Sequence, residues 1–76
     1  MYAATDLRSA PLHTDLTLVD APESSRQRLS SLGLRVGTPF TLIAKTAGGG
    51  RVALVTGSRI ALGSSLLHQL RAEVRG

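Results

Sequence analysis

Residues 28–40 constrain the fold more than any other part of this chain. Leu29 and Leu32 are three residues apart, so on a helix they share one face. Gly33 follows directly, and glycine is the residue that most often ends a helix, because without a Cβ it enters the left-handed conformation freely. Leu34 then supplies the apolar side chain that commonly packs back on the last helical turn. The sequence therefore predicts a helix that ends near Leu32.

A second glycine, Gly37, indicates a turn soon after the helix, and a strand follows it. The apolar residues Phe40, Leu42 and Ala44 recur with the period of a strand, so we expect a strand over residues 38–45. A short helix that leads directly into a series of strands predicts a mainly β fold, a small barrel with one inserted helix. A barrel of this size has no room for an enclosed active site, so we expect its function to lie on its surface.

The inserted helix is expected over about residues 22–32. Asp20 and Glu23 have the spacing of a capping box, in which Asp20 caps the first turn and Glu23 reaches back to it. Pro22 is tolerated there because the first helical amides have no partners inside the helix. The expected inner stripe of this helix is Ser25, Leu29 and Leu32.

Four further segments show the alternation or the flanking turns of strands. They are residues 14–20, 51–56, 59–62 and 70–75. Three consecutive glycines in residues 47–50 predict a hairpin loop, and residues 64–69 predict a short helical turn. Residues 1–10 are expected to be a loose lead-in from which Leu7 packs onto the barrel. Together these segments predict a single domain over residues 1–76 with about five strands.

The composition excludes several classes of protein. The chain has 76 residues, no cysteine, and a formal net charge of +4 from nine basic and five acidic residues. Without cysteine it has no disulfide and no thiolate ligand for a metal, and no apolar run approaches the roughly 20 residues that span a bilayer. The N-terminus lacks the apolar core and early positive charge of a secretory signal. We therefore expect a cytoplasmic protein that does not insert into the membrane.

Two segments of the chain resemble a known family. Residues 28–37 read Arg-Leu-Ser-Ser-Leu-Gly-Leu-Arg-Val-Gly, and residues 57–62 read Gly-Ser-Arg-Ile-Ala-Leu. These segments and their spacing resemble the patterns of the FeoA family, ferrous iron transport protein A, over about residues 6–75. Val36 stands where the family usually has proline, and His13 stands where a glycine often precedes the first strand. Both patterns describe turns and core, so they identify the fold better than the function.

The resemblance implies an SH3-like β-barrel. It also implies a non-enzymatic, cytosolic accessory role beside a membrane ferrous iron transporter that carries a GTPase domain. It carries over no catalytic residue and no cofactor. The same module occurs as the C-terminal domain of iron-dependent repressors, so a stand-alone relative of that domain remains an alternative.

Several chemical functions find little support in the residues themselves. No histidine lies three or four residues from another histidine or a carboxylate, so we expect no metal site. Residues 48–50 lack the Gly-Lys-Ser/Thr of a phosphate loop, and no serine stands in a Gly-x-Ser-x-Gly elbow. The charge permits a nucleic-acid partner, but Tyr2 and Phe40 are the only aromatic residues on which bases could stack. We expect neither an enzyme nor a nucleic-acid partner, although nucleic-acid binding by a small basic barrel is the runner-up hypothesis.

A protein partner fits the sequence better, because arginine is enriched among the residues that dominate binding at interfaces. Five residues are candidates for partner contact. They are Arg26 and Arg28 on the flank of the helix, Leu34 and Arg35 in the turn after it, and Arg59 in the strand 59–62. The alternative for Arg28 and Arg59 is that their stems only cover the barrel. The sequence leaves self-association open.

Overall fold

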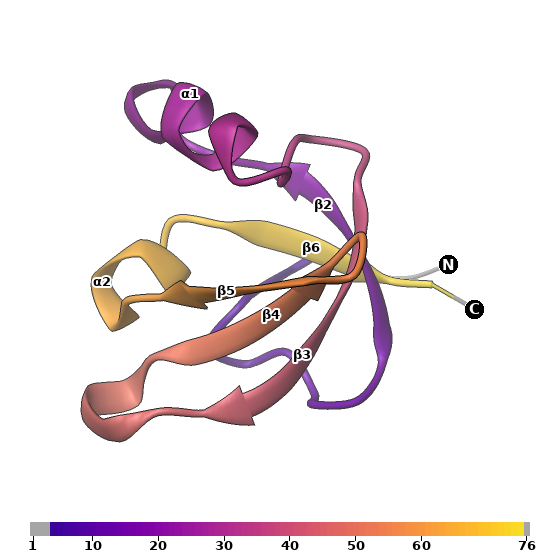
Figure 1. Cartoon of the computed structure of the whole chain (residues 1–76), viewed down its shortest axis with the longest axis vertical. Helices are drawn as coiled ribbons and strands as arrows, with labels where there is room; N and C mark the ends of the chain where they lie inside the picture. Colours follow the sequence, from indigo (N-terminus) through magenta and orange to yellow (C-terminus); the bar gives the residue numbers. More distant parts are fainter. Residues whose placement is uncertain (1–3, 76) are drawn as a thin grey trace.

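In residues 4–75, which the computed structural model describes, six strands and two short helices form the chain (Figure 1). The strands are β1 (Thr5–Asp6), β2 (Asp15–Asp20), β3 (Pro39–Lys45), β4 (Arg51–Val55), β5 (Ser58–Leu62) and β6 (Arg71–Val74). The helices are α1 (Glu23–Ser31) and α2 (Ser64–Leu67), and a 3-10 turn, η1, spans Ala47–Gly49. The predicted mainly β fold with one inserted helix is confirmed.

One antiparallel sheet contains all six strands, in the order β1-β6-β2-β3-β4-β5. The predicted hairpin at residues 47–50 joins β3 to β4, and α1 is inserted between β2 and β3. The sheet curls so that its strands cross one another in projection, with α1 standing at one end beside β2 and α2 at the end of β5 (Figure 1). The two edges of the sheet are therefore β1 and β5.

The core lies inside the curl and follows from strand alternation. Leu16 and Leu18 of β2 are 0% and 1% exposed, whereas Thr17 and Val19 between them remain half-buried. Every buried side chain in the described residues is apolar. Each such leucine contributes roughly 1.5–3 kcal/mol of burial free energy. The interior is hydrocarbon, so chemistry and recognition are left to the surface.

The expected loose lead-in is wrong for the part of it that the structure describes. Thr5 and Asp6 pair with β6, and Ala10 is 7% exposed. The expected packing of Leu7 onto the barrel is confirmed, because this side chain is fully buried. The pairing with β6 adds a sixth strand to the five that the sequence predicts. A strand of two residues has no alternation to detect, which is why the sequence did not reveal it. Residues 1–3 of the expected lead-in lie outside the described residues.

The predicted capping box is also wrong. Helix α1 begins at Glu23 with Pro22 as its N-cap, and no side chain caps the first turn. Asp20 is instead the last residue of β2, and its carboxylate lies 3.5 Å from the guanidinium of Arg26. Strand pairing extends to Asp20, so the helix starts too far along the chain for this side chain to reach its free amides.

The end of α1 forms as predicted. Gly33 has a φ of +93°, its N–H donates to the carbonyl of Ser30 at 2.9 Å, and the N–H of Leu34 donates to the carbonyl of Leu29 at 2.9 Å. These two bonds define a Schellman motif. Leu29 and Leu34 are each 1% exposed, but Leu32 is 44% exposed, so its predicted place on the inner stripe is wrong. The short helix turns one leucine toward the sheet, and Leu34 from beyond the glycine supplies the second.

Candidate functional site

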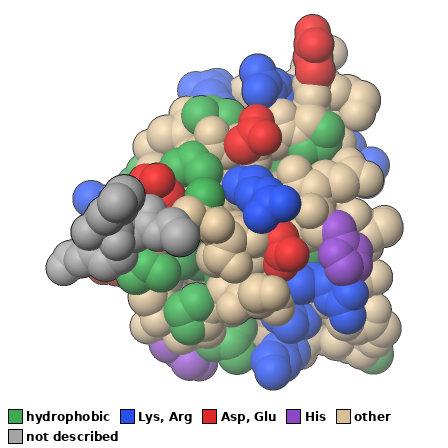
Figure 2. Space-filling model, turned by 180° about the vertical axis from the view of Figure 1, so that it is seen from behind, with side chains coloured by type: hydrophobic (Ala, Val, Ile, Leu, Met, Phe, Trp, Pro, Cys, Tyr) green, Lys and Arg blue, Asp and Glu red, His purple; other side chains and the backbone are tan. Residues whose placement is uncertain are grey.

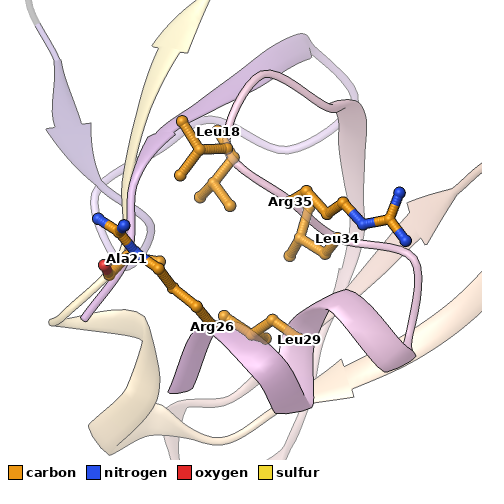
Figure 3. Close-up of a pocket in the computed structure, with 7 residues that line it drawn as sticks. Leu18, Ala21, Arg26, Leu29, Leu34 and Arg35 are labelled. Carbon is orange, nitrogen blue, oxygen red and sulfur yellow. Dashed lines mark hydrogen bonds between the residues drawn. The ribbon is translucent and has the colours of Figure 1, made fainter. Parts of the chain in front are cut away.

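A pocket of about 150 Å³ opens between α1, β2 and the turn that follows the helix (Figure 3). Its lining is mostly apolar and carries two arginines; the residues are Leu18, Ala21, Arg26, Leu29, Leu34, Arg35 and Val36. Leu18 faces Leu29 across the opening, with Arg26 at one side and Arg35 at the other (Figure 3). A space of this volume holds a group about the size of benzene. The pocket can therefore accept one aliphatic or aromatic side chain.

The pocket exists because α1 contacts the sheet through few residues. Among its nine residues only Leu29 is buried. The turn after the helix is fastened to β2 by two hydrogen bonds, from the N–H of Gly37 to the carbonyl of Leu18 at 2.7 Å and from the N–H of Leu18 to the carbonyl of Thr38 at 3.1 Å. Helix and turn are thus held on either side of a gap that Leu29 alone does not fill.

Arg26 is fixed at one side of the opening. Its Nε donates to the carbonyl of Ala21 at 2.8 Å, and its Nη2 lies 3.5 Å from Oδ1 of Asp20. The two charged side chains remain 55% and 66% exposed, so this ion pair adds little to stability. Its effect is to hold the arginine stem along the rim of the pocket.

Arg35 is fixed at the other side. Its Nε donates to Oγ of Ser30 at 2.7 Å, and its backbone N–H donates to Oγ1 of Thr38 at 3.1 Å. No partner for its two terminal nitrogens is found in the described residues. The guanidinium points away from the pocket (Figure 3) and is free to meet a carboxylate on another molecule.

The structure brings together three of the five predicted contact residues. Arg26, Leu34 and Arg35 all line the pocket, although Leu34 is buried and forms its wall rather than an exposed contact. Arg28 is exposed on α1 but does not line the pocket, and Arg59 is exposed on β5, paired across the strands with Leu54 of β4.

Four lining residues were not predicted as site residues, namely Leu18, Ala21, Leu29 and Val36. Leu29 was predicted only as part of the inner stripe of the helix. Leu18 and Ala21 are 1% and 2% exposed and read as core. Val36 is 50% exposed, and an apolar residue beside a turn glycine was the one available signal that this turn presents an apolar surface. The pocket is a gap between elements, so it depends on tertiary packing that no local pattern records.

Other charged groups form local contacts outside this site. The backbone N–H of Ser9 donates to Oδ1 of Asp6 at 3.0 Å, and this bond lowers the pKa of the Asp6 carboxyl. Nη1 of Arg8 lies 2.7 Å from Nε2 of His68, which accepts the hydrogen bond when that nitrogen is unprotonated. Within residues 4–75 no cluster of three or more histidine, aspartate or glutamate side chains could hold a metal ion.

The basic side chains do not form one continuous field on the face turned away from the view of Figure 1. Figure 2 shows Lys and Arg at several separate places on that face, with acidic and apolar side chains between them. None of the helices that the structure describes has the length and apolar character needed to cross a membrane.

Comparison with known proteins identifies the module. A family model described as the FeoA domain matches residues 7–74. A crystal structure of an iron uptake regulatory protein, FeoA, has a TM-score of 0.82 and 22% identity, over 96% of this chain and 99% of that one. An NMR structure of a FeoA-like protein from Clostridium acetobutylicum has a TM-score of 0.80 and 19% identity, over 97% and 90% of the two chains.

A third structure, ScaR with bound Zn²⁺, has a TM-score of 0.76 and 22% identity. It covers 90% of this chain, but this chain spans only 35% of that protein. No curated protein matches the sequence.

The fold is thus the SH3-like fold of the FeoA proteins. Because the family model covers nearly the whole sequence, the chain belongs to the FeoA family, whose members are involved in ferrous iron transport.

Proposed function

We propose that this chain is a non-enzymatic accessory protein of ferrous iron uptake, which acts in the cytosol by docking onto the GTPase-bearing part of a membrane iron transporter. The pocket beside α1 is the observation that carries the proposal. It combines an apolar opening with two arginines held at its rim by hydrogen bonds. Membership of the FeoA family directs the proposal toward iron transport.

The pocket and its rim contribute to recognition in different ways. The apolar walls gain free energy by burying one side chain of the partner, since removing apolar surface from water is favourable by roughly 25 cal/mol per Å². The free nitrogens of Arg35 can form charge-assisted hydrogen bonds with a carboxylate beside that side chain. Arg28 is exposed on the same helix but does not line the pocket, so its contact with the partner is a separate part of this proposal. An apolar anchor flanked by acidic groups is the partner surface that this arrangement suits.

A binding experiment with matched variants tests the proposal. The full chain is titrated with the purified cytosolic, GTPase-bearing part of the transporter that is encoded with it. We expect Arg35→Glu and Val36→Asp each to weaken binding by about 10-fold or more, because a central interface residue contributes roughly 1–2 kcal/mol. Arg75→Glu is the control, since Arg75 is exposed and does not line the pocket.

Iron uptake provides the second measurement. A strain that lacks the gene should take up less ferrous iron, and the wild-type and Arg75→Glu chains should restore uptake better than Arg35→Glu. If the wild-type chain does not bind the transporter and its deletion leaves ferrous iron uptake unchanged, the proposed function is wrong. Equal binding of the transporter by all the variants would show that the pocket is not the docking site.

A second candidate, which the family resemblance leaves open, is a stand-alone relative of the C-terminal domain of iron-dependent repressors. The likeness to ScaR is consistent with it, because there the same fold is part of a longer protein. Such a chain would not bind the transporter. A complex with a DNA-binding partner, together with no transporter binding in the titration above, would favour this candidate.

A further inference from the structure

The two edges of the sheet differ in how well they are protected. Edge β1 has two residues, whereas edge β5 has five and pairs with β4 in unbroken register. Natural proteins commonly protect an edge by making it short or by adding proline, lysine or a bulge, because its unpaired backbone groups invite another strand. The sequence of β5, Ser-Arg-Ile-Ala-Leu, contains neither proline nor lysine, and its pairing shows no bulge.

The turn before β5 determines which of its backbone groups are free. Val55 and Ser58 close a two-residue turn, in which Thr56 and Gly57 have φ values of +50° and +82°. The closing pair of such a hairpin exchanges hydrogen bonds, and bonded and non-bonded pairs then alternate along an antiparallel ladder. The N–H and C=O groups of Arg59 and Ala61 therefore point away from β4.

These groups are open in the folded chain. Arg59 and Ala61 are both exposed. The bonds of the β4–β5 ladder come from Ser58, Ile60 and Leu62, and no other described residue bonds to the backbone of Arg59 or Ala61. Two residues that alternate in this way can exchange four hydrogen bonds with one added antiparallel strand.

The side chains along this edge indicate what kind of strand would add. Arg59 lies across from Leu54, which is 37% exposed, and Ala61 lies across from Val52. Arg59 has no side-chain hydrogen bond or ion pair within residues 4–75. The edge thus presents one unpaired positive charge and, two residues further along, an apolar position.

We propose that the β5 edge accepts an extended segment of a partner protein as an antiparallel seventh strand, with an acidic side chain opposite Arg59 and an apolar one opposite Ala61. Main-chain hydrogen bonds would provide the attachment and these two positions the selectivity, as in other cases of strand addition. The inference rests on the proposed function only in taking the partner to be a protein.

A second copy of this chain suits the edge less well. Pairing β5 with its own copy would place Arg59 opposite Ala61 and leave the two Arg59 side chains as diagonal neighbours on one face. The chain also carries a net charge of +4, so like charges would oppose each other across a short interface. An acidic segment from another protein instead neutralises Arg59.

The edge also begins beside the end of α1. A Cβ placed on Gly33 would lie 4.0 Å from Cγ1 of Val55, so the β4–β5 turn packs beside the end of α1. One partner could therefore place a side chain in the pocket and a strand along β5.

Amide hydrogen exchange on the full chain tests the inference. In the free protein we expect fast exchange at Arg59 and Ala61 and slow exchange at Ile60, whose N–H faces β4. The probe is the capped peptide Thr-Val-Thr-Glu-Thr, which places glutamate opposite Arg59 and valine opposite Ala61. At millimolar concentration it should slow exchange at Arg59 and Ala61, and the same peptide with lysine in place of glutamate should bind several-fold more weakly.

Three variants separate the contribution of the backbone from that of the charge. Ala61→Pro removes an outward N–H without touching the β4 ladder, and proline is tolerated at such an edge position; it should abolish peptide binding, whereas Ala61→Val should retain it. Arg59→Glu should reverse the preference, so that the lysine peptide binds better than the glutamate peptide. Thermal melts confirm that each variant is folded before binding is measured.

The outcomes distinguish this inference from the proposed function. Protection of Arg59 and Ala61 in the free chain, or peptide binding that Ala61→Pro leaves unchanged, would overturn strand addition at β5. Transporter binding that persists in Ala61→Pro but is lost in Arg35→Glu would support the proposed function and show that the transporter does not bind at the β5 edge. Peptide protection at β5 without any binding to the transporter would support the edge and contradict the proposed function.

Discussion

Replacing Gly33 tests the physical basis of the helix end. Gly33 has a φ of +93°, and the nearest atom to a Cβ built on it is Cγ1 of Val55 at 4.0 Å, an ordinary van der Waals distance. An added methyl group therefore meets no obstacle, and the cost of Gly33→Ala comes from the backbone alone. A left-handed conformation costs an L-residue roughly 1–2 kcal/mol, which for a domain of this size lowers the melting temperature by about 4–16 °C.

Graded substitutions make the assay more specific. Gly33→Val should lower the free energy of unfolding more than Gly33→Ala does, because a β-branched side chain fits positive φ worst. Gly33→Asn should lower the free energy of unfolding least of the three, because asparagine is the other residue that commonly follows a helix in this conformation. Thermal unfolding followed by circular dichroism gives the order directly.

The control is Gly63→Ala. Gly63 has a φ of −69° and no neighbour within 4 Å of an added Cβ. Alanine restricts the unfolded chain, which raises the free energy of unfolding, but it is a poorer N-cap for α2 than glycine, which lowers it by a similar amount. The free energy of unfolding should therefore change by less than about 0.5 kcal/mol. Equal melting temperatures for Gly33→Val and wild type, or an equal loss at Gly63, would refute this account of the helix end.

Three further changes have expected outcomes. Val36→Pro should raise the free energy of unfolding by about 0.5–1 kcal/mol, because position 36 is the second residue of a type II turn, where proline is favoured. The turn is defined by the N–H of Thr38, which donates to the carbonyl of Arg35 at 2.9 Å, and by the φ of +93° at its third residue, Gly37. A lower melting temperature would contradict the assigned turn. Thr56→Asn should stabilise the chain by about 1 kcal/mol in chemical denaturation, because threonine has a φ of +50° there and asparagine tolerates that region better. The Ser9 N–H lowers the pKa of Asp6 in the folded chain, so its carboxylate stabilises the fold above its unfolded pKa. The difference in melting temperature between wild type and Asp6→Asn should be full at neutral pH, begin to decline near the unfolded pKa of about 4, and vanish once the pH has fallen through the lower folded pKa. A difference that does not change with pH would contradict this.

Local patterns were enough to predict most of the fold. The alternation of Leu16 and Leu18 placed β2, and the glycine after a pair of leucines placed the end of α1. One departure from the family pattern now has a physical explanation. His13, where the family often has glycine, has a φ of +58°, so this position requires the left-handed conformation that glycine adopts most easily.

The errors have a common physical origin, because in each case a long-range contact decided the outcome. Asp20 could not cap α1 because pairing with β6 keeps it in β2. Leu32 is exposed because the Schellman motif brings Leu34 into the place it would have filled. The short strand β1 forms only because β6 offers it a partner.

The candidate site was only partly predictable for the same reason. Arginines in the helix and the following turn were named from residue type, and two of them line the pocket. The wall opposite Leu29 is formed by Leu18 of β2, and these two residues face each other only once α1 has packed beside the sheet. Arg59 was also named, but the sequence did not show that it stands on an open edge of the sheet.

Chemical-shift mapping of the isotope-labelled full chain is the most direct test of the central claim, which is that partners dock at the pocket beside α1. During titration with the cytosolic, GTPase-bearing part of the transporter, the largest amide shifts should fall at Arg26, Leu34, Arg35 and Val36, which line the pocket. Binding that leaves these four amides unshifted, or shifts confined to the distant η1 turn, would contradict it.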